Sequence, residues 1–153
     1  MKRLLPILLF LITISLSAQQ KRSERHAKIK ALKVAFITEK LDLSELEAQK
    51  FWPIYNAFDD KSTKIKFQDI RKIRYKLRQG VATMSDEEAN ELLSQLMKAE
   101  YELHNERVKL VGKLRSVISA KKIILLKSAE DDFNKRMLER FKNQRQRTKK
   151  NKP

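Results

Sequence analysis

Glycine and proline are so scarce in this chain that they leave little alternative to helices. The 153 residues include two glycines and three prolines, whereas sheets and α/β folds need many tight turns, which are rich in these residues. Charged residues make up 35% of the chain, and apolar residues recur at three- and four-residue spacing. This combination is typical of long helices with solvated faces. The sequence therefore predicts an all-α fold in one modest domain.

The first eighteen residues have the pattern of a secretory signal peptide. Two basic residues follow Met1, residues 4–16 are apolar, and small residues at 15–18 offer a cleavage site after Ser17 or Ala18. An uncleaved membrane anchor is less favoured, because a spanning helix needs about 20 apolar residues. A lipoprotein anchor is excluded, because the chain has no cysteine. We expect a periplasmic protein with a flexible N-terminus at residues 19–26.

Residues 41–58 are expected to form the centre of the core. Ser44, followed three residues later by Glu47, has the pattern of a capping box, which satisfies two backbone N–H groups at the start of a helix. Leu43 precedes the cap. Five large apolar residues follow, including the only tryptophan: Phe51, Trp52, Ile54, Tyr55 and Phe58. Of these, we expect Phe51, Trp52, Ile54 and Phe58 to be largely buried.

Helical periodicity and capping signals divide the chain into four helices. Gly80 ends the second, and Ser85 with Glu88 forms another capping box at the start of the third. The expected helices cover residues 27–41, 45–79, 86–117 and 120–141. Helices this long favour an elongated antiparallel four-helix hairpin, which a second copy would complete as a homodimer. The helical domain is expected at residues 27–141, followed by a basic disordered tail at 142–153.

The third helix has a seam of leucines that Glu100 and Arg107 interrupt. The favoured interpretation is that both are exposed edge positions. The alternative is that they set the register against a partner helix, as polar residues in a coiled-coil seam sometimes do.

Two motifs give the chain a resemblance to a known family. Leu43, Ser44 and Glu47 are similar to the Leu-Thr-x-x-Gln motif that occurs twice in the Spy/CpxP group of periplasmic proteins. Ile118 and Ser119 are similar to a second copy, in which Lys122 replaces the final acceptor. The phrase around Phe-Trp-Pro-Ile-Tyr at 51–55 resembles the branch labelled as sensors of extracytoplasmic-function sigma factors.

The resemblance covers about residues 28–141 and carries expectations for fold and function. It implies an antiparallel four-helix hairpin, usually a cradle-shaped homodimer. It also implies a role in envelope stress, either holding unfolded proteins or damping a membrane-bound sensor. Related members bind heavy metals.

The chain offers little for catalysis. It has two histidines, no cysteine and no glycine-rich loop. His26 lies near the N-terminus, and His104 could bind a metal together with Glu100 and Met97. Zinc and copper sites normally use three or four protein ligands, so a solvated histidine beside a carboxylate is the favoured interpretation. We expect no catalytic residue, no cofactor and no metal ligand.

Residues 61–78 carry a band of nearly one charge, with eight Lys or Arg against Asp69 alone. A solvated face is the plain interpretation, but a band of one sign also attracts anionic partners. Cations interleaved with aromatic residues suit unfolded envelope proteins, anionic lipid or nucleic acid, of which nucleic acid is least expected after export. The predicted partner-binding residues are Lys61, Lys64, Lys66, Phe67, Arg71, Lys72, Arg74, Tyr75 and Arg78.

The favoured function is that of a non-enzymatic envelope-stress protein that binds unfolded or membrane-associated proteins. It would act as a periplasmic chaperone or as a sensor or modulator of a sigma-factor pathway. The alternatives are a basic structural protein bound to anionic lipid and a periplasmic heavy-metal sensor. A cytoplasmic nucleic-acid binder is the least favoured.

Overall fold

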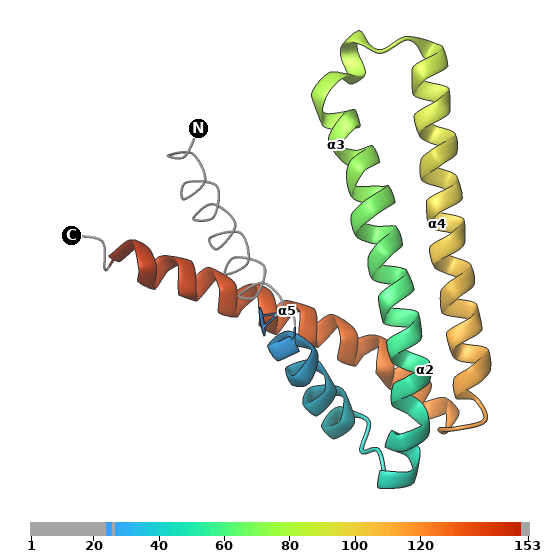
Figure 1. The fold of residues 1–153 in the computed structure, drawn as a ribbon, viewed down its shortest axis with the longest axis vertical. Helices are drawn as coiled ribbons and strands as arrows, with labels where there is room; N and C mark the ends of the chain where they lie inside the picture. Colours follow the sequence, from blue (N-terminus) through green and yellow to red (C-terminus); the bar gives the residue numbers. More distant parts are fainter. Residues whose placement is uncertain (1–23, 26, 151–153) are drawn as a thin grey trace, which may run out of the picture. The chain divides into compact units, whose positions relative to one another are not determined.

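The computed structural model describes residues 24–25 and 27–150, with side chains as far as residue 147. These residues are helical apart from short turns and contain no strand, which confirms the predicted all-α class (Figure 1). Within the described part, no helix is both long enough and apolar enough to cross a membrane. The predicted signal peptide, most of the expected flexible N-terminus and His26 lie outside the described residues.

The helices follow one another with short connections. A helix over residues 27–40 ends in a turn where Asp42 has a φ of 47°, a left-handed conformation that Asp tolerates better than most residues. The later elements are α2 (Glu45–Lys64), the π-helix η1 (Ile65–Ile70), α3 (Arg71–Gly80), the 3₁₀ turn η2 (Val81–Thr83), α4 (Asp86–Leu114) and α5 (Ala120–Lys150).

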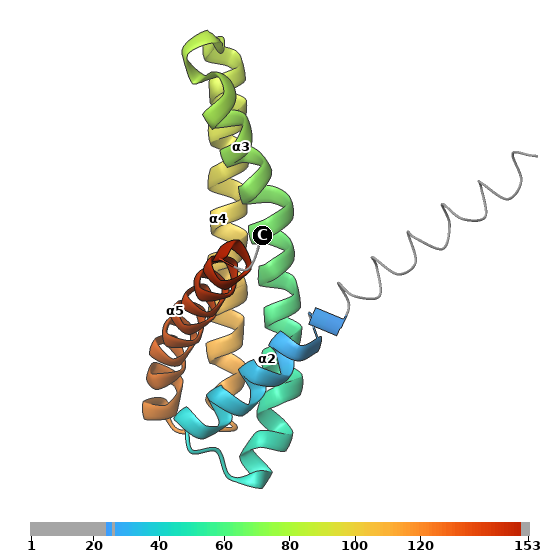
Figure 2. The same cartoon turned by 90° about the vertical axis from the view of Figure 1, so that its left-hand side faces the viewer.

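The chain divides into two compact units. The long-helix unit comprises Leu43–Ile124, and the terminal unit comprises Met1–Asp42 and Leu125–Pro153. In the long-helix unit, α2, η1 and α3 follow one another without a break. They lie beside α4, to which η2 joins them at one end (Figures 1 and 2).

Both predicted capping boxes are present, which explains where α2 and α4 begin. The Ser44 N–H donates to Glu47 Oε2 at 2.9 Å, and the Glu47 N–H donates to Ser44 Oγ at 3.3 Å. Ser85 and Glu88 make the same two bonds at 3.1 and 3.2 Å. These bonds satisfy N–H groups that have no partner within the helix.

The π-helix keeps the apolar stripe of the second helical segment facing α4. A regular α-helix would return to the face of Ile65 at Asp69 and Lys72, and would therefore bury two charged residues. The wider turn of η1 brings Ile70 to that face instead. Ile65, Ile70 and Ala99 form a buried cluster, against which Leu96 and Leu103 pack. This π-helix corrects the continuous α-helix that the periodicity predicts over residues 45–79.

The aromatic cluster of α2 lies on one face, and its members differ from those expected. Phe51 and Phe58 are buried, with exposed fractions of 0% and 5%, and Tyr55 is buried at 1%. These positions are spaced four and three residues apart, so they share one side of the helix. Trp52 and Ile54 lie beside that face and are only half-buried, which corrects the expectation that they are largely buried.

In the terminal unit, the helix over 27–40 packs on α5 through aromatic contacts. The rings of Phe36 and Phe133 lie 5.8 Å apart, and both residues are buried. The guanidinium of Arg136 lies 5.1 Å from the Phe36 ring centroid, at a distance where a cation is attracted to the ring face.

The helix α5 continues to Lys150, where the sequence analysis expected disorder from residue 142. The expectation rested on the lack of large apolar residues, which removes tertiary contacts but does not prevent helix formation. Lys, Arg and Gln, which dominate this segment, are good helix formers. No side chain from residue 138 to 147 is buried.

Candidate binding surface

The predicted partner-binding residues all lie on the surface of the long-helix unit. Each of the nine is exposed, and the residues Phe67 and Tyr75 have exposed fractions of 60% and 57%. The isoleucines of the same segment turn inward, because they pack towards α4. The buried isoleucines therefore fix this segment against α4. The two large aromatic side chains lie among cations on its exposed side.

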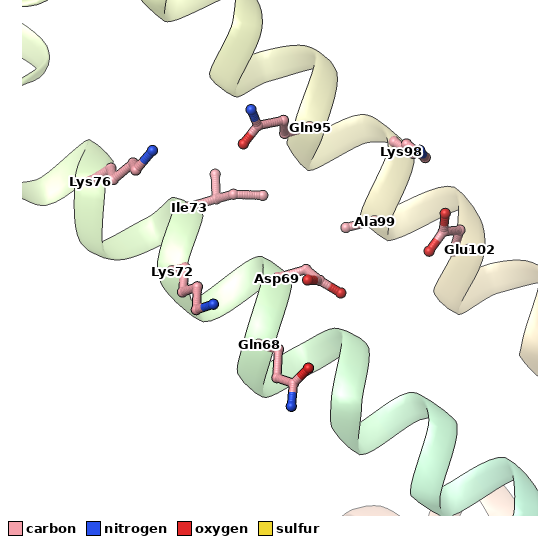
Figure 3. Close-up of a pocket in the computed structure, with 9 residues that line it drawn as sticks. All are labelled: Gln68, Asp69, Lys72, Ile73, Lys76, Gln95, Lys98, Ala99 and Glu102. Atoms are coloured by element: carbon pink, nitrogen blue, oxygen red, sulfur yellow. The ribbon is translucent and has the colours of Figure 1, made fainter.

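Part of the basic band lines open grooves between the helices. One groove, of about 350 Å³, is lined by Gln68, Asp69, Lys72, Ile73, Lys76, Gln95, Lys98, Ala99 and Glu102. Figure 3 shows Ile73 and Ala99 pointing towards each other across it. A second, of about 510 Å³, includes Lys61, Lys64 and Glu106. A third, of about 600 Å³ near η2, includes Tyr75 and Lys76.

Another part of the band lies outside these three grooves. Arg71, Arg74 and Arg78 are spaced three and four residues apart along α3, so they form one stripe on its surface. Phe67 lies about one turn before Arg71, in η1. We call these four residues the arginine stripe. All four are exposed, and none of the four lines a groove described above.

The basic band lies beside an acidic helix, which reduces the net charge of this surface. Residues 86–106 hold seven Asp or Glu against Lys98 alone, and residues 61–106 together hold nine basic and eight acidic residues. The fields of opposite charges on adjacent helices cancel at distances greater than the spacing of the helices, and salt screens what is left beyond the Debye length of about 8 Å at physiological salt. The band alone predicts a field of one sign, but beside the acidic helix it can attract a partner strongly only at short range.

One ion pair crosses directly between the two charged helices. Lys61 Nζ lies 3.4 Å from Glu106 Oε2, and Lys109 Nζ lies 2.7 Å from Glu106 Oε1. The ammonium of Lys109, and secondly that of Lys61, hold the pKa of Glu106 below its usual value. Lys61 therefore has a role within the fold, which makes it a weaker candidate for partner binding than the arginine stripe.

Arg107 contacts an aromatic ring of its own chain. It is therefore not simply an exposed edge position, and its contact is not with a partner helix. Its guanidinium lies 4.5 Å from the centroid of the Phe58 ring, and the residue is half-buried. An arginine in this position covers an aromatic face with a cation. Arg107 thus packs α4 against α2, whereas Glu100 is exposed.

The two motif serines each begin a helix, and the third residue after each takes part in one ion pair. Ser119 Oγ accepts a hydrogen bond from the Lys122 N–H at 3.3 Å. Lys122 Nζ lies 2.7 Å from Glu47 Oε2. Ile118 is buried and Leu43 is half-buried. The two motif copies are therefore in direct contact.

The described residues do not bring together a metal-binding group. Residues 24–25 and 27–150 contain no set of three or more His, Asp or Glu side chains close enough to hold one ion. His104 and Glu100 are exposed, as is Met97.

The chain matches no protein-family model, no curated protein and no solved structure. Membership of the Spy/CpxP group therefore stays a prediction, which rests on the two capping motifs, the residues around Phe51 and the signal-peptide pattern.

Proposed function

We propose that this chain is an exported, non-enzymatic envelope-stress protein of the Spy/CpxP type. It binds partly unfolded or membrane-associated proteins, either as a periplasmic chaperone or as a sensor or modulator of an extracytoplasmic-function sigma-factor pathway. The proposal includes a cleaved signal peptide, the antiparallel four-helix hairpin of that group and a homodimer.

The observation that carries the proposal is the arginine stripe. Arginine forms bidentate hydrogen bonds with carboxylates and stacks on aromatic rings, and Phe67 adds apolar contact with 60% of its surface exposed. An unfolded chain exposes carboxylates, aromatic rings and apolar side chains in no fixed order. A row of long, adaptable side chains can therefore bind many such chains without demanding one sequence.

Charge reversal of the stripe tests the proposal. The triple variant Arg71→Glu, Arg74→Glu, Arg78→Glu should lose the ability to suppress the aggregation of a heat-denatured client, as followed by light scattering. Circular dichroism and sedimentation should show that it remains folded with the same mass as the parent protein, because all three side chains are exposed.

A matched control keeps the change in net charge the same. The variant Lys113→Glu, Arg115→Glu, Lys121→Glu alters three exposed cations elsewhere in the long-helix unit, and it should protect the client as well as the parent does. Equal protection by both variants would rule out the stripe as the binding surface. An equal loss in both would show that net charge matters rather than the stripe.

Export is tested separately by N-terminal sequencing. Protein recovered from the envelope fraction should begin at Ala18 or Gln19. Recovery of the full-length chain from the cytoplasm would contradict the export that the proposal requires.

A further inference from the structure

The C-terminal half of α5, residues 135–150, is helical although little of the protein covers it. Among the described side chains, which reach residue 147, Phe133 is the last buried one, Met137 is half-buried, and every side chain from 138 to 147 is exposed. A helix of this length is only marginally stable in water when it is isolated, because helices in proteins gain most of their stability from tertiary packing. A surface that covers one side of this segment would therefore stabilise the helix.

The charge of this segment indicates the kind of surface. Residues 135–150 contain eight Lys or Arg against Glu139 alone. The helix that packs on α5 does not cancel this charge, because residues 27–40 add four lysines and one glutamate. Nearer the start of α5, Asp131 is paired with Lys127 at 2.8 Å. Residues 27–40 and 135–150 together hold twelve basic and two acidic residues, in contrast to the balanced charges of residues 61–106.

Two large apolar side chains stand exposed within this charge. Leu138 and Phe141 have exposed fractions of 61% and 45% and lie three residues apart, so they are neighbours on the helix surface. At about 100° per residue, Lys142 and Arg145 lie beside them. Phe133 and Arg136, by contrast, contact Phe36 of the helix over residues 27–40, and the position of Leu138 lies well away from theirs on α5.

We propose that residues 135–150 of α5 dock on an anionic lipid bilayer surface. Leu138 and Phe141 enter the boundary between headgroups and acyl chains, while Lys135, Lys142 and Arg145 contact the lipid phosphates. Amphipathic helices with a basic polar face bind membranes in this way, through buried apolar area together with attraction to anionic lipid. Nucleic acid fits less well, because its phosphate backbone gives Leu138 and Phe141 no apolar surface.

This inference goes beyond the proposed function and does not depend on it. The lipid-binding residues belong to the terminal unit, whereas the arginine stripe belongs to the long-helix unit. A protein that bound lipid but failed to protect clients would therefore refute one proposal and support the other.

The test measures binding to vesicles of phosphatidylglycerol mixed with phosphatidylcholine, and to vesicles of phosphatidylcholine alone. The parent protein and the variants are purified from cells without further processing. All of them therefore have the same N-terminus, and differences in binding come from the substitutions. The quantity measured by co-sedimentation is the excess of binding to anionic over zwitterionic vesicles. This excess should be clear at low salt and should fall steeply at 0.5 M salt, where screening is strong.

Two double variants locate the surface. Leu138→Ser with Phe141→Ser should reduce binding to anionic vesicles by about tenfold or more, because apolar insertion is lost. Lys142→Gln with Arg145→Gln should reduce it by about tenfold, because each cation near an anionic surface contributes a few-fold. The control Leu46→Ser with Val108→Ser removes two apolar side chains that are 72% and 55% exposed in the other unit, and it should bind as the parent does.

Three outcomes would overturn the proposal. The parent protein could show no excess binding to anionic vesicles at low salt. The Leu138 and Phe141 variant could bind as tightly as the control. Duplex DNA could be bound as tightly as the vesicles, with no effect of removing Leu138 and Phe141, which would show a general polyanion-binding helix instead.

Discussion

Glu47 and Lys122 occupy equivalent positions, each the third residue after a capping serine, and their side chains form an ion pair. Lys122 Nζ lies 2.7 Å from Glu47 Oε2, and the same carboxylate oxygen accepts the Ser44 N–H at 2.9 Å. A lysine in the first turn of a helix is ordinarily unfavourable, because the helix dipole is positive there. The carboxylate of Glu47 offsets this cost, because it places a negative charge beside the ammonium of Lys122.

This ion pair predicts a specific dependence on pH. The ammonium of Lys122, and secondly the backbone N–H of Ser44, hold the pKa of Glu47 below its usual 4.5. The folded state thus favours the ionised carboxylate. Its stabilising contribution is present above the pKa of the unfolded chain and is lost as the pH falls through the lower pKa of the folded state. Carboxyl NMR titration should show a lowered pKa for Glu47.

Two substitutions at neighbouring lysines identify the cause of this shift. Lys122→Met should raise the pKa of Glu47 towards its usual value. Lys121→Met, which alters an exposed neighbour, should leave that pKa unchanged. An unaltered pKa in the Lys122 variant would mean that the two side chains do not pair in solution.

The capping serines should differ in their contribution to stability. Ser44→Ala should lower the free energy of unfolding by about 1 kcal/mol, a typical loss for a helix N-cap. Ser119→Ala should cost less, because Ser119 makes one capping bond and has no reciprocal Glu partner. Urea denaturation measures both. Equal and negligible losses would place the helix starts elsewhere and remove the main basis of the family resemblance.

The aromatic cluster should be most sensitive at its buried face. Phe51→Ala and Phe58→Ala should each cost about 3–5 kcal/mol, because each leaves a cavity in a packed core. Ile54→Ala should cost clearly less, since Ile54 is only half-buried. Denaturation midpoints give the order. A larger loss at Ile54 than at Phe51 would mean that the other side of α2 faces the core.

The π-helix should be removable without loss of the fold. Deletion of the exposed Gln68 shortens the step between Ile65 and Ile70 to four residues, which a regular α-helix places on one face. We expect the unfolding midpoint to be retained or raised. The control is deletion of the exposed Ser94 in α4, where no wide turn absorbs the change, and the apolar stripe should rotate away from its partners.

The Ser94 deletion should therefore be strongly destabilising. If both deletions lowered the midpoint equally, the π-helix would not be the element that sets the phase of the apolar stripe.

The helices could be predicted from the sequence because their signals are local. Ser44 with Glu47 and Ser85 with Glu88 mark helix starts by bonds within one turn. The π-helix was harder, although the five-residue step between Ile65 and Ile70 was visible. A wide turn is favoured there only because α4 lies alongside, and that contact is not local.

The residues of the candidate binding surface could be predicted as a set, but their arrangement could not. Composition identified the basic band, and all nine predicted residues are exposed. Which cations line grooves beside α4, and which form the arginine stripe, depends on how η1 turns the helix. The acidic residues of 86–106 could also be identified directly from the sequence. Placing them opposite the band required knowing that the two segments lie side by side.

Photo-crosslinking at single positions tests the central claim most directly. Phe67→benzoylphenylalanine places a photoreactive group within the arginine stripe, and Met97→benzoylphenylalanine places the same group at a side chain of α4 that is 50% exposed. Each variant is irradiated with a heat-denatured client, and the products are analysed by gel electrophoresis. We predict a crosslinked complex with the client for position 67 and little or none for position 97. Crosslinking at position 97 without crosslinking at position 67 would contradict the account and place the client on the outer face of α4.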